Sequence, residues 1–123
     1  MDLKYLIRLD REHINLIRHI CLKENSFQSA STLFYEGQTP IVAYLVIDGV
    51  VNLVKNRRIK TTLKSGSLIG LKELMLNKPV PLEAKVEANS SLVFLDKSTI
   101  QEIINATHGS DLSMLFRELV EAS

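Results

Sequence analysis

The chain has 123 residues, of which 46% are hydrophobic and 24% charged, a size and balance typical of one globular domain. Its formal charge of +1 creates no overall field that would attract DNA or an anionic membrane. One cysteine makes no internal disulfide, and the apolar runs are too short to span a bilayer. These features predict a cytoplasmic protein that binds neither DNA nor a membrane.

Apolar residues recur at helical spacing near the N-terminus, where Ile14, Ile17 and Cys21 share one stripe. Asp10 precedes this stripe, and aspartate is a favoured N-cap residue. The pattern predicts a helix over residues 10–22 with one face packed inward. On that face, Cys21 is predicted to be a small core residue rather than a nucleophile.

Residues 26–64 contain short runs of branched and aromatic side chains separated by turn residues. Such runs predict antiparallel strands joined by tight turns. They are Leu33 to Tyr35, Ala43 to Ile47, Val50 to Val54 and Ile59 to Leu63. Asp48-Gly49 further predicts a hairpin, because glycine adopts the positive φ that hairpin turns require.

A basic cluster falls on the predicted turn between the last two of these runs. It consists of Lys55, Arg57, Arg58 and Lys60. The first interpretation is a solvated hairpin tip, since such tips are normally polar. The alternative is a patch that meets an acidic protein surface.

The second half of the chain predicts a short helical turn over 71–76 and strands over 84–88 and 92–95. Ser98-Thr99-Ile100-Gln101 has the pattern of a capping box and opens a helix that closes at His108-Gly109. A final helix follows with apolar residues at i, i+3, i+4 and i+7, namely Leu112, Leu115, Phe116 and Leu119. We expect a second copy of the chain or another protein to cover this face.

Catalysis has no residues to support it. No two of His13, His19 and His108 have the i, i+4 spacing of a metal site on one helix face. The sequence also has no nucleophile elbow, P-loop or dinucleotide fingerprint. We therefore expect no catalytic residue, no metal and no cofactor.

Three segments carry a resemblance to a known family: Phe34 to Gly37 followed by Tyr44 to Val50, Leu63 to Gly70, and Ala84 to Ala88. Their spacing resembles the cyclic-nucleotide-binding fold of catabolite activator protein and of protein kinase A regulatory subunits. The resemblance covers residues 10–123 and implies one domain over 1–123. It implies a mainly β fold, an antiparallel, jelly-roll-like β-roll over 26–96, with an N-terminal helix and two C-terminal helices over 98–122.

In that family, a phosphate-binding cassette, here over 66–88, holds the ligand. A glutamate after its glycine accepts the ribose hydroxyl, and an arginine after its proline binds the cyclic phosphate with two charge-assisted hydrogen bonds. This chain has Leu71 and Leu82 at those positions, and leucine does neither. We therefore expect no binding of cyclic AMP or cyclic GMP in the family's manner.

The candidate pocket is the cassette itself, and its lining is expected to be Ile69, Gly70, Leu71, Lys72, Glu73, Leu74, Pro81, Leu82, Glu83 and Ala84. A shift of register would bring Glu73 near a ribose. Lys72, Lys78 or Lys85 would then supply positive charge, although a lysine is a point charge rather than a planar fork.

Two functions remain open. In the first, the chain is a regulatory or signalling module that has lost the nucleotide contacts and docks to a protein partner or to itself, through the last helix and the cassette surface. In the second, the chain is a small-molecule sensor that binds a nucleotide or another anion in the same pocket by different contacts and signals through its last helices.

Overall fold

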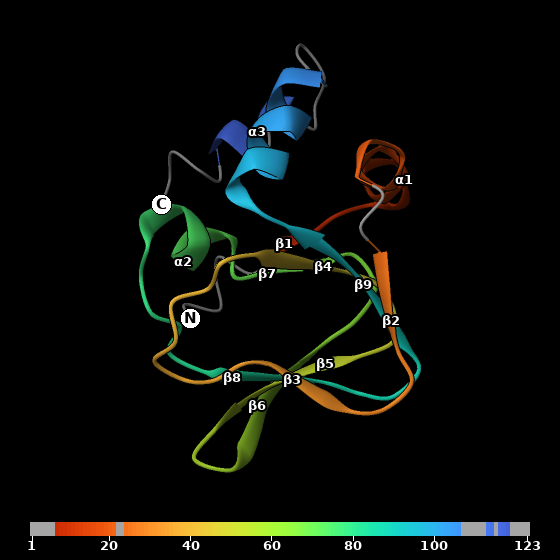
Figure 1. The fold of residues 1–123 in the computed structure, drawn as a ribbon. Coiled ribbons are helices and arrows are strands. Elements are labelled where there is room, and N and C mark those ends of the chain that lie inside the picture. Colours follow the sequence, from red (N-terminus) through yellow and green to blue (C-terminus); the bar gives the residue numbers. More distant parts are fainter. Residues whose placement is uncertain (1–6, 22–23, 107–112, 115, 119–123) are drawn as a thin grey trace.

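The computed structural model of the chain describes residues 7–21, 24–106, 113–114 and 116–118. They form two antiparallel β-sheets, one of which is covered by helices (Figure 1). In Figure 1 the five-stranded sheet lies in the middle, the four-stranded sheet lies below it, and helices Arg11–Ile20 (α1) and Lys97–Ala106 (α3) lie above. No helix in these described ranges is both long and apolar enough to cross a membrane.

The five-stranded sheet has the order β1-β7-β4-β9-β2. Its strands are Ile7–Arg8 (β1), Ser67–Ile69 (β7), Ala43–Asp48 (β4), Ser90–Leu95 (β9) and Glu24–Phe27 (β2). The central pair is β4 and β9, in which Tyr44 lies opposite Phe94 and Leu45 opposite Val93. Both strands have apolar side chains on both faces, so this sheet is buried between two layers.

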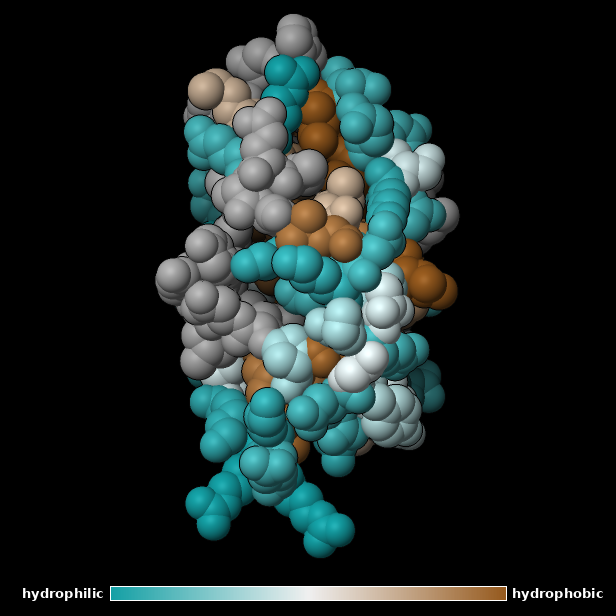
Figure 2. Space-filling view, turned by 90° about the vertical axis from the view of Figure 1, so that its left-hand side faces the viewer, coloured by the Kyte–Doolittle hydropathy of each residue, from teal (hydrophilic) through white to brown (hydrophobic). Residues whose placement is uncertain are grey.

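The four-stranded sheet has the order β3-β8-β5-β6. Its strands are Ser31–Phe34 (β3), Glu83–Val86 (β8), Val51–Lys55 (β5) and Arg58–Leu63 (β6). The β5–β6 hairpin turns at Asn56 and Arg57, which both have positive φ (53° and 64°), as in a type I′ turn. Figure 2 shows this hairpin as a hydrophilic projection at the lower end of the molecule.

The predicted hairpin tip is confirmed, because Arg57, Arg58 and Lys60 are exposed. Lys55, the fourth basic residue of the cluster, lies 3.6 Å from the Glu36 carboxylate. That ion pair is solvent-exposed at both ends and contributes little to stability.

The five-stranded sheet separates two apolar cores. The helix-side core lies between this sheet and the helices and consists of Leu9, Ile17, Cys21, Ala43, Leu45, Leu68, Leu71, Leu74, Val93, Leu95, Ile100, Ile103, Ile104 and Phe116. The inter-sheet core lies between the two sheets and consists of Phe34, Tyr44, Val46, Val51, Leu53, Leu63, Ile69, Val80, Leu82, Ala84, Val86 and Leu92. Alternate residues of β4 and β9 face opposite sides of the five-stranded sheet, so neighbours in sequence along these two strands enter different cores.

The N-terminal helix is confirmed, with Asp10 as its N-cap. The Asp10 carboxylate accepts a hydrogen bond from the His13 backbone N–H at 2.8 Å. Ile17 and Cys21 are buried in the helix-side core, as the apolar stripe predicts. The helical turn predicted over 71–76 is also confirmed, as Leu71–Leu76 (α2).

Sequence reasoning missed three strands and misplaced one cap. The short strands β1, β2 and β7 were not predicted. The helix after β9 begins at Lys97, and its N-cap is Asp96 rather than a residue of the predicted capping box. The Asp96 carboxylate accepts from the Thr99 N–H at 2.7 Å, and its carbonyl accepts from the Ile100 N–H at 3.0 Å. The predicted helix end at His108-Gly109 lies outside the described residues.

The hairpin predicted at Asp48-Gly49 is wrong. β4 pairs with β7 and β9, whereas β5 pairs with β6 and β8, so the turn carries the chain from one sheet to the other. Gly49 has a φ of +94°, and a Cβ there would lie 2.1 Å from the Ser90 hydroxyl and 2.6 Å from the Ser90 Cα. Glycine is therefore required both by the backbone conformation and by the close approach of β9.

The variant Gly49→Ala tests this close approach. We expect it to lose about 2–5 kcal/mol of unfolding free energy, combining about 1–2 for positive φ and about 1–3 for overpacking. Gly37→Ala is the matched control, because Gly37 has a φ of +88° but no atom within 4 Å of its added Cβ. Urea unfolding of both variants measures the difference, and equal losses would show that Ser90 moves aside without cost.

Candidate functional site

The candidate cassette begins where β7 ends. Gly70, with a φ of +81°, turns the chain into α2, and its carbonyl accepts the Leu74 N–H at 2.9 Å. Asn77, with a φ of +52°, ends the helix, and the Lys78 N–H donates to the Glu73 carbonyl at 2.9 Å. The cassette helix is thus fixed by backbone hydrogen bonds at both ends.

The loop that follows α2 is held by the segment after β3. The Val80 N–H donates to the Gln38 carbonyl at 2.9 Å, and the Gly37 N–H donates to the Val80 carbonyl at 2.7 Å. Val80 is 1% exposed and belongs to the inter-sheet core. The cassette backbone is therefore a packed part of the β-roll.

Leu71 does not face the space between the sheets. Leu71 and Leu74 lie three residues apart on one face of α2 and both belong to the helix-side core, where α3 contributes Ile100 and Ile103. The leucine at the position that matches the family's ribose-binding glutamate therefore packs between the sheet and the helices. Leu71 and Leu82 were predicted to line one pocket, and in the structure they belong to different cores.

Leu82 points into the inter-sheet core. It is 7% exposed and alternates with Ala84 and Val86, which are fully buried on the same side of the strand. Ile69 enters this core from the opposite sheet. The position that matches the family's phosphate-binding arginine is thus occupied by an apolar side chain among apolar neighbours.

The remaining candidates on β8 and beside it lie away from that core. Glu83 is half-buried, and its carboxylate lies 3.9 Å from the Lys85 ammonium, which is exposed. Lys78 is exposed, and Lys72 and Pro81 are half-buried. Because Lys85 alternates with the inward-facing Ala84 and Val86, its charge lies on the outer face of the sheet.

Glu73 is the one charged side chain that is buried among the described residues, with 7% exposure. It lies two positions from Leu71 in α2, about 200° around the helix axis, and so on the face opposite the helix-side core. Burial raises the pKa of the Glu73 carboxyl above its ordinary value of 4.5. Among its described residues the cassette therefore has one buried acid.

Among the apolar and aromatic residues that form the inter-sheet core, Tyr44 is the one with a polar side-chain group, its hydroxyl. It donates to the Leu33 carbonyl at 3.3 Å, and burial raises its pKa above 10.0. Its ring makes an edge contact with Phe94 at 5.0 Å between centroids and a tilted contact with Phe34 at 6.2 Å. This hydroxyl is thus used within the fold, and the described part of the core contains no cation.

Phe116 corrects the predicted interaction face. It is 0% exposed within this chain and belongs to the helix-side core, so this side chain packs against the domain itself. The Ser113 hydroxyl donates to the Ile104 carbonyl at 3.0 Å and joins this residue to α3. The other three residues of the predicted face, Leu112, Leu115 and Leu119, lie outside the described residues.

No group of three His, Cys, Asp or Glu side chains that would hold a metal occurs in the part of the chain that the structure describes. The two-sheet roll, the cassette helix between β7 and β8 and the flanking helices define the class of the domain. It is a β-roll of the kind that binds cyclic nucleotides.

Comparison with known families agrees with this class. Residues 24–107 match the family described as the cyclic nucleotide-binding domain, and the chain belongs to that family. A comparison with curated proteins finds no match.

Solved structures show the same fold. Thermus thermophilus catabolite activator protein is 20% identical with a TM-score of 0.71, over 93% of this chain and 54% of that one. A protein from a cyclic-GMP-dependent signalling pathway that regulates bacterial phytopathogenesis is 17% identical with a TM-score of 0.75, over 94% of both chains. The PKAR domain CBD2 with bound Sp-2Cl-cAMPS is 21% identical with a TM-score of 0.64, over 90% of this chain and 80% of that one. This chain thus spans about half of the catabolite activator protein.

The variant Glu73→Gln tests the buried carboxyl. Since the folded-state pKa is raised, ionisation of Glu73 costs folding free energy as the pH rises above its ordinary value of 4.5. We expect the variant to be more stable than the wild type at neutral pH and equally stable near pH 3, well below the ordinary pKa, where Glu73 is protonated in both the folded and the unfolded state. Urea unfolding at the two pH values measures this, with the exposed Glu102→Gln as control. A variant less stable at neutral pH would show that the carboxylate is stabilised by a partner.

Proposed function

We propose that the chain is a non-catalytic regulatory module that acts in the cytoplasm by docking to another protein and does not bind cyclic AMP or cyclic GMP. One observation carries the proposal. Leu82, at the position that matches the family's arginine, is 7% exposed inside the inter-sheet core, and the described residues place no guanidinium or ammonium there.

The absence of a cation in the described part of this core is expected to prevent tight binding of a cyclic nucleotide. A cyclic phosphate buried without a charged partner costs several kcal/mol, and the whole binding free energy of a micromolar ligand is about 8 kcal/mol. Apolar contacts with the base would have to offset that cost. The PKAR domain with bound Sp-2Cl-cAMPS shares the fold with this chain at 21% identity, which is too low to transfer its ligand.

The positions of Leu71 and Leu82 also indicate that two substitutions would not restore nucleotide binding. Leu82→Arg would bury a guanidinium in the inter-sheet core, and Leu71→Glu would bury a carboxylate in the helix-side core. The two new charges would lie on different sides of the five-stranded sheet. Each would therefore be buried without the other and would destabilise the fold.

Calorimetric titration tests the proposal. We expect cyclic AMP and cyclic GMP at millimolar concentration to give no saturable heat with this chain, because no cation of the described residues would pair with the phosphate. The PKAR domain CBD2 titrated with Sp-2Cl-cAMPS is the positive control. A dissociation constant in the low micromolar range for either nucleotide would refute the proposal.

A second candidate function rests on Glu73. A buried carboxylate in the cassette helix is a group that would accept a ligand hydroxyl, which favours a sensor for a hydroxylated small molecule other than a cyclic nucleotide. A thermal-shift screen of nucleosides and sugars tests it. The sensor hypothesis requires a ligand that raises the melting temperature of the wild type and not that of Glu73→Gln.

A further inference from the structure

A groove lies outside the β-roll, between the start of α1 and the turn that joins β6 to β7. Its volume is about 390 Å³, and its polar lining consists of Arg8, Asp10, Arg11, Asn15, Arg18 and Ser65. It uses none of the cassette residues. Three arginines therefore line one groove in a chain whose formal charge is only +1.

Helical geometry aligns part of this lining. Arg11, Asn15 and Arg18 stand at i, i+4 and i+7, so they form a single row along one face of α1. Seven residues of α-helix rise about 10 Å, so the backbones of Arg11 and Arg18 lie about 10 Å apart along the groove.

Arg8 faces the row from the β-sheet side and is fixed in place. Its Nε donates to the Ser65 carbonyl at 3.1 Å, and the Ser65 hydroxyl donates to the Ile47 carbonyl at 2.8 Å. Below the side chains, the backbones of Leu9 and Gly66 pack closely. The Leu9 N–H donates to the Gly66 carbonyl at 2.7 Å, and a Cβ on Gly66 would lie 2.5 Å from the Leu9 carbonyl oxygen. The groove is thus built before any ligand binds, which lowers the entropic cost of binding.

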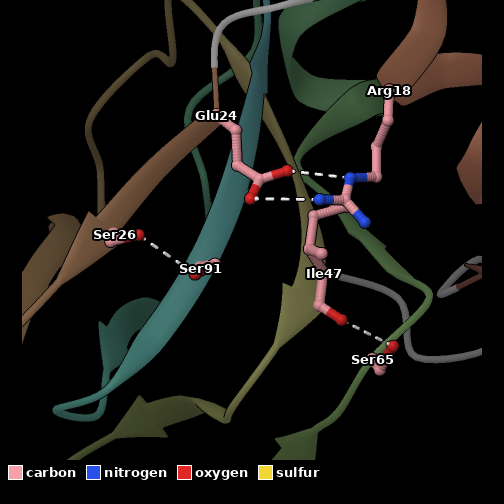
Figure 3. A network of polar contacts seen from close by, with 6 residues as sticks. All are labelled: Arg18, Glu24, Ser26, Ile47, Ser65 and Ser91. Carbon is pink, nitrogen blue, oxygen red and sulfur yellow. Dashed lines mark hydrogen bonds and ion pairs between the residues drawn. The ribbon is translucent and has the colours of Figure 1, made fainter.

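Two acidic side chains near the groove, Asp10 and Glu24, each have a partner within the fold. The Asp10 carboxylate caps α1 by accepting the His13 N–H, and Glu24 of β2 accepts two contacts from Arg18, at 2.9 Å and 3.5 Å (Figure 3). No acidic side chain of the described residues pairs with Arg8 or Arg11. The Arg18–Glu24 pair shows how a carboxylate binds to this row, with both oxygens facing one guanidinium.

We propose that this groove is the docking site for an acidic segment of a partner protein, bound in an extended conformation. Arg8 and Arg11 supply positive charge that no acid of the described residues pairs with, and carboxylates two residues apart in an extended chain project to the same side, so two of them face the groove together. Planar guanidiniums suit carboxylates because they bind both oxygens. The inference rests on the proposed function, since it names the surface through which the module docks.

The test measures fluorescence anisotropy of a fluorescein-labelled deca-glutamate peptide with the full chain. We expect saturable binding that weakens with added salt and falls at least tenfold in the double variant Arg8→Gln, Arg11→Gln. The matched control is Arg57→Gln, Arg58→Gln, which removes the same charge from the β5–β6 tip and is expected to change the affinity less than twofold. Arg18 is left intact because its pair with Glu24 joins α1 to β2. Circular dichroism and melting temperature confirm that both variants are folded.

Three results would refute the proposed docking site: no peptide binding by the wild type, equal losses of affinity in the two double variants, or inorganic pyrophosphate binding as tightly as the peptide. The last result would identify a small-anion site instead. Cyclic AMP is titrated in parallel, so that the two proposals fail separately. Nucleotide binding refutes the proposed function, whereas absence of both nucleotide and peptide binding refutes the groove alone.

Discussion

The strands β4 and β9 are apolar on both faces, and the rest of the domain is arranged around that fact. Residues that alternate along them enter two cores, with Leu45 and Val93 on the helix side and Val46 and Leu92 between the sheets. The helices cover one face because it would otherwise expose a continuous apolar surface, and the four-stranded sheet covers the other. The alternation fixes the register of these strands, because a slip of one residue would move every side chain to the opposite face of the sheet.

This constraint explains what the cassette can do. The space between the sheets receives Leu82, and α2 turns Leu71 to the other side of the five-stranded sheet, while Glu73 lies on the opposite face of the helix. The fold of the family is kept, and we propose that apolar packing replaces its charged contacts. The polar surface that remains available is elsewhere, in the arginine-lined groove beside α1.

Local patterns predicted the local structure well. The α1 stripe, the Asp10 cap, α2 and the four runs of β3 to β6 depend on neighbouring residues, so their periodicity and turn chemistry are visible in the sequence. Sheet membership depends on distant residues, and this is why Asp48-Gly49 was interpreted as a hairpin when the close approach of Ser90 in fact makes it a crossing between sheets. The same limit applies to the candidate site. The sequence shows leucine at positions 71 and 82, but which core each side chain enters depends on distant residues. The row of Arg11, Asn15 and Arg18 was visible at helical spacing, but its meeting with Arg8 and Ser65 was not.

Methyl NMR of the inter-sheet core tests the central claim, that apolar packing has replaced the nucleotide site. With labelled leucine and valine methyl groups, the account predicts that millimolar cyclic AMP or cyclic GMP leaves the resonances of Leu53, Leu82 and Val86 unshifted. It also predicts nuclear Overhauser contacts between the Leu82 methyl groups and other members of this core. Saturable shifts of these three residues on addition of nucleotide, or a Leu82 side chain without contacts to the core, would contradict the account.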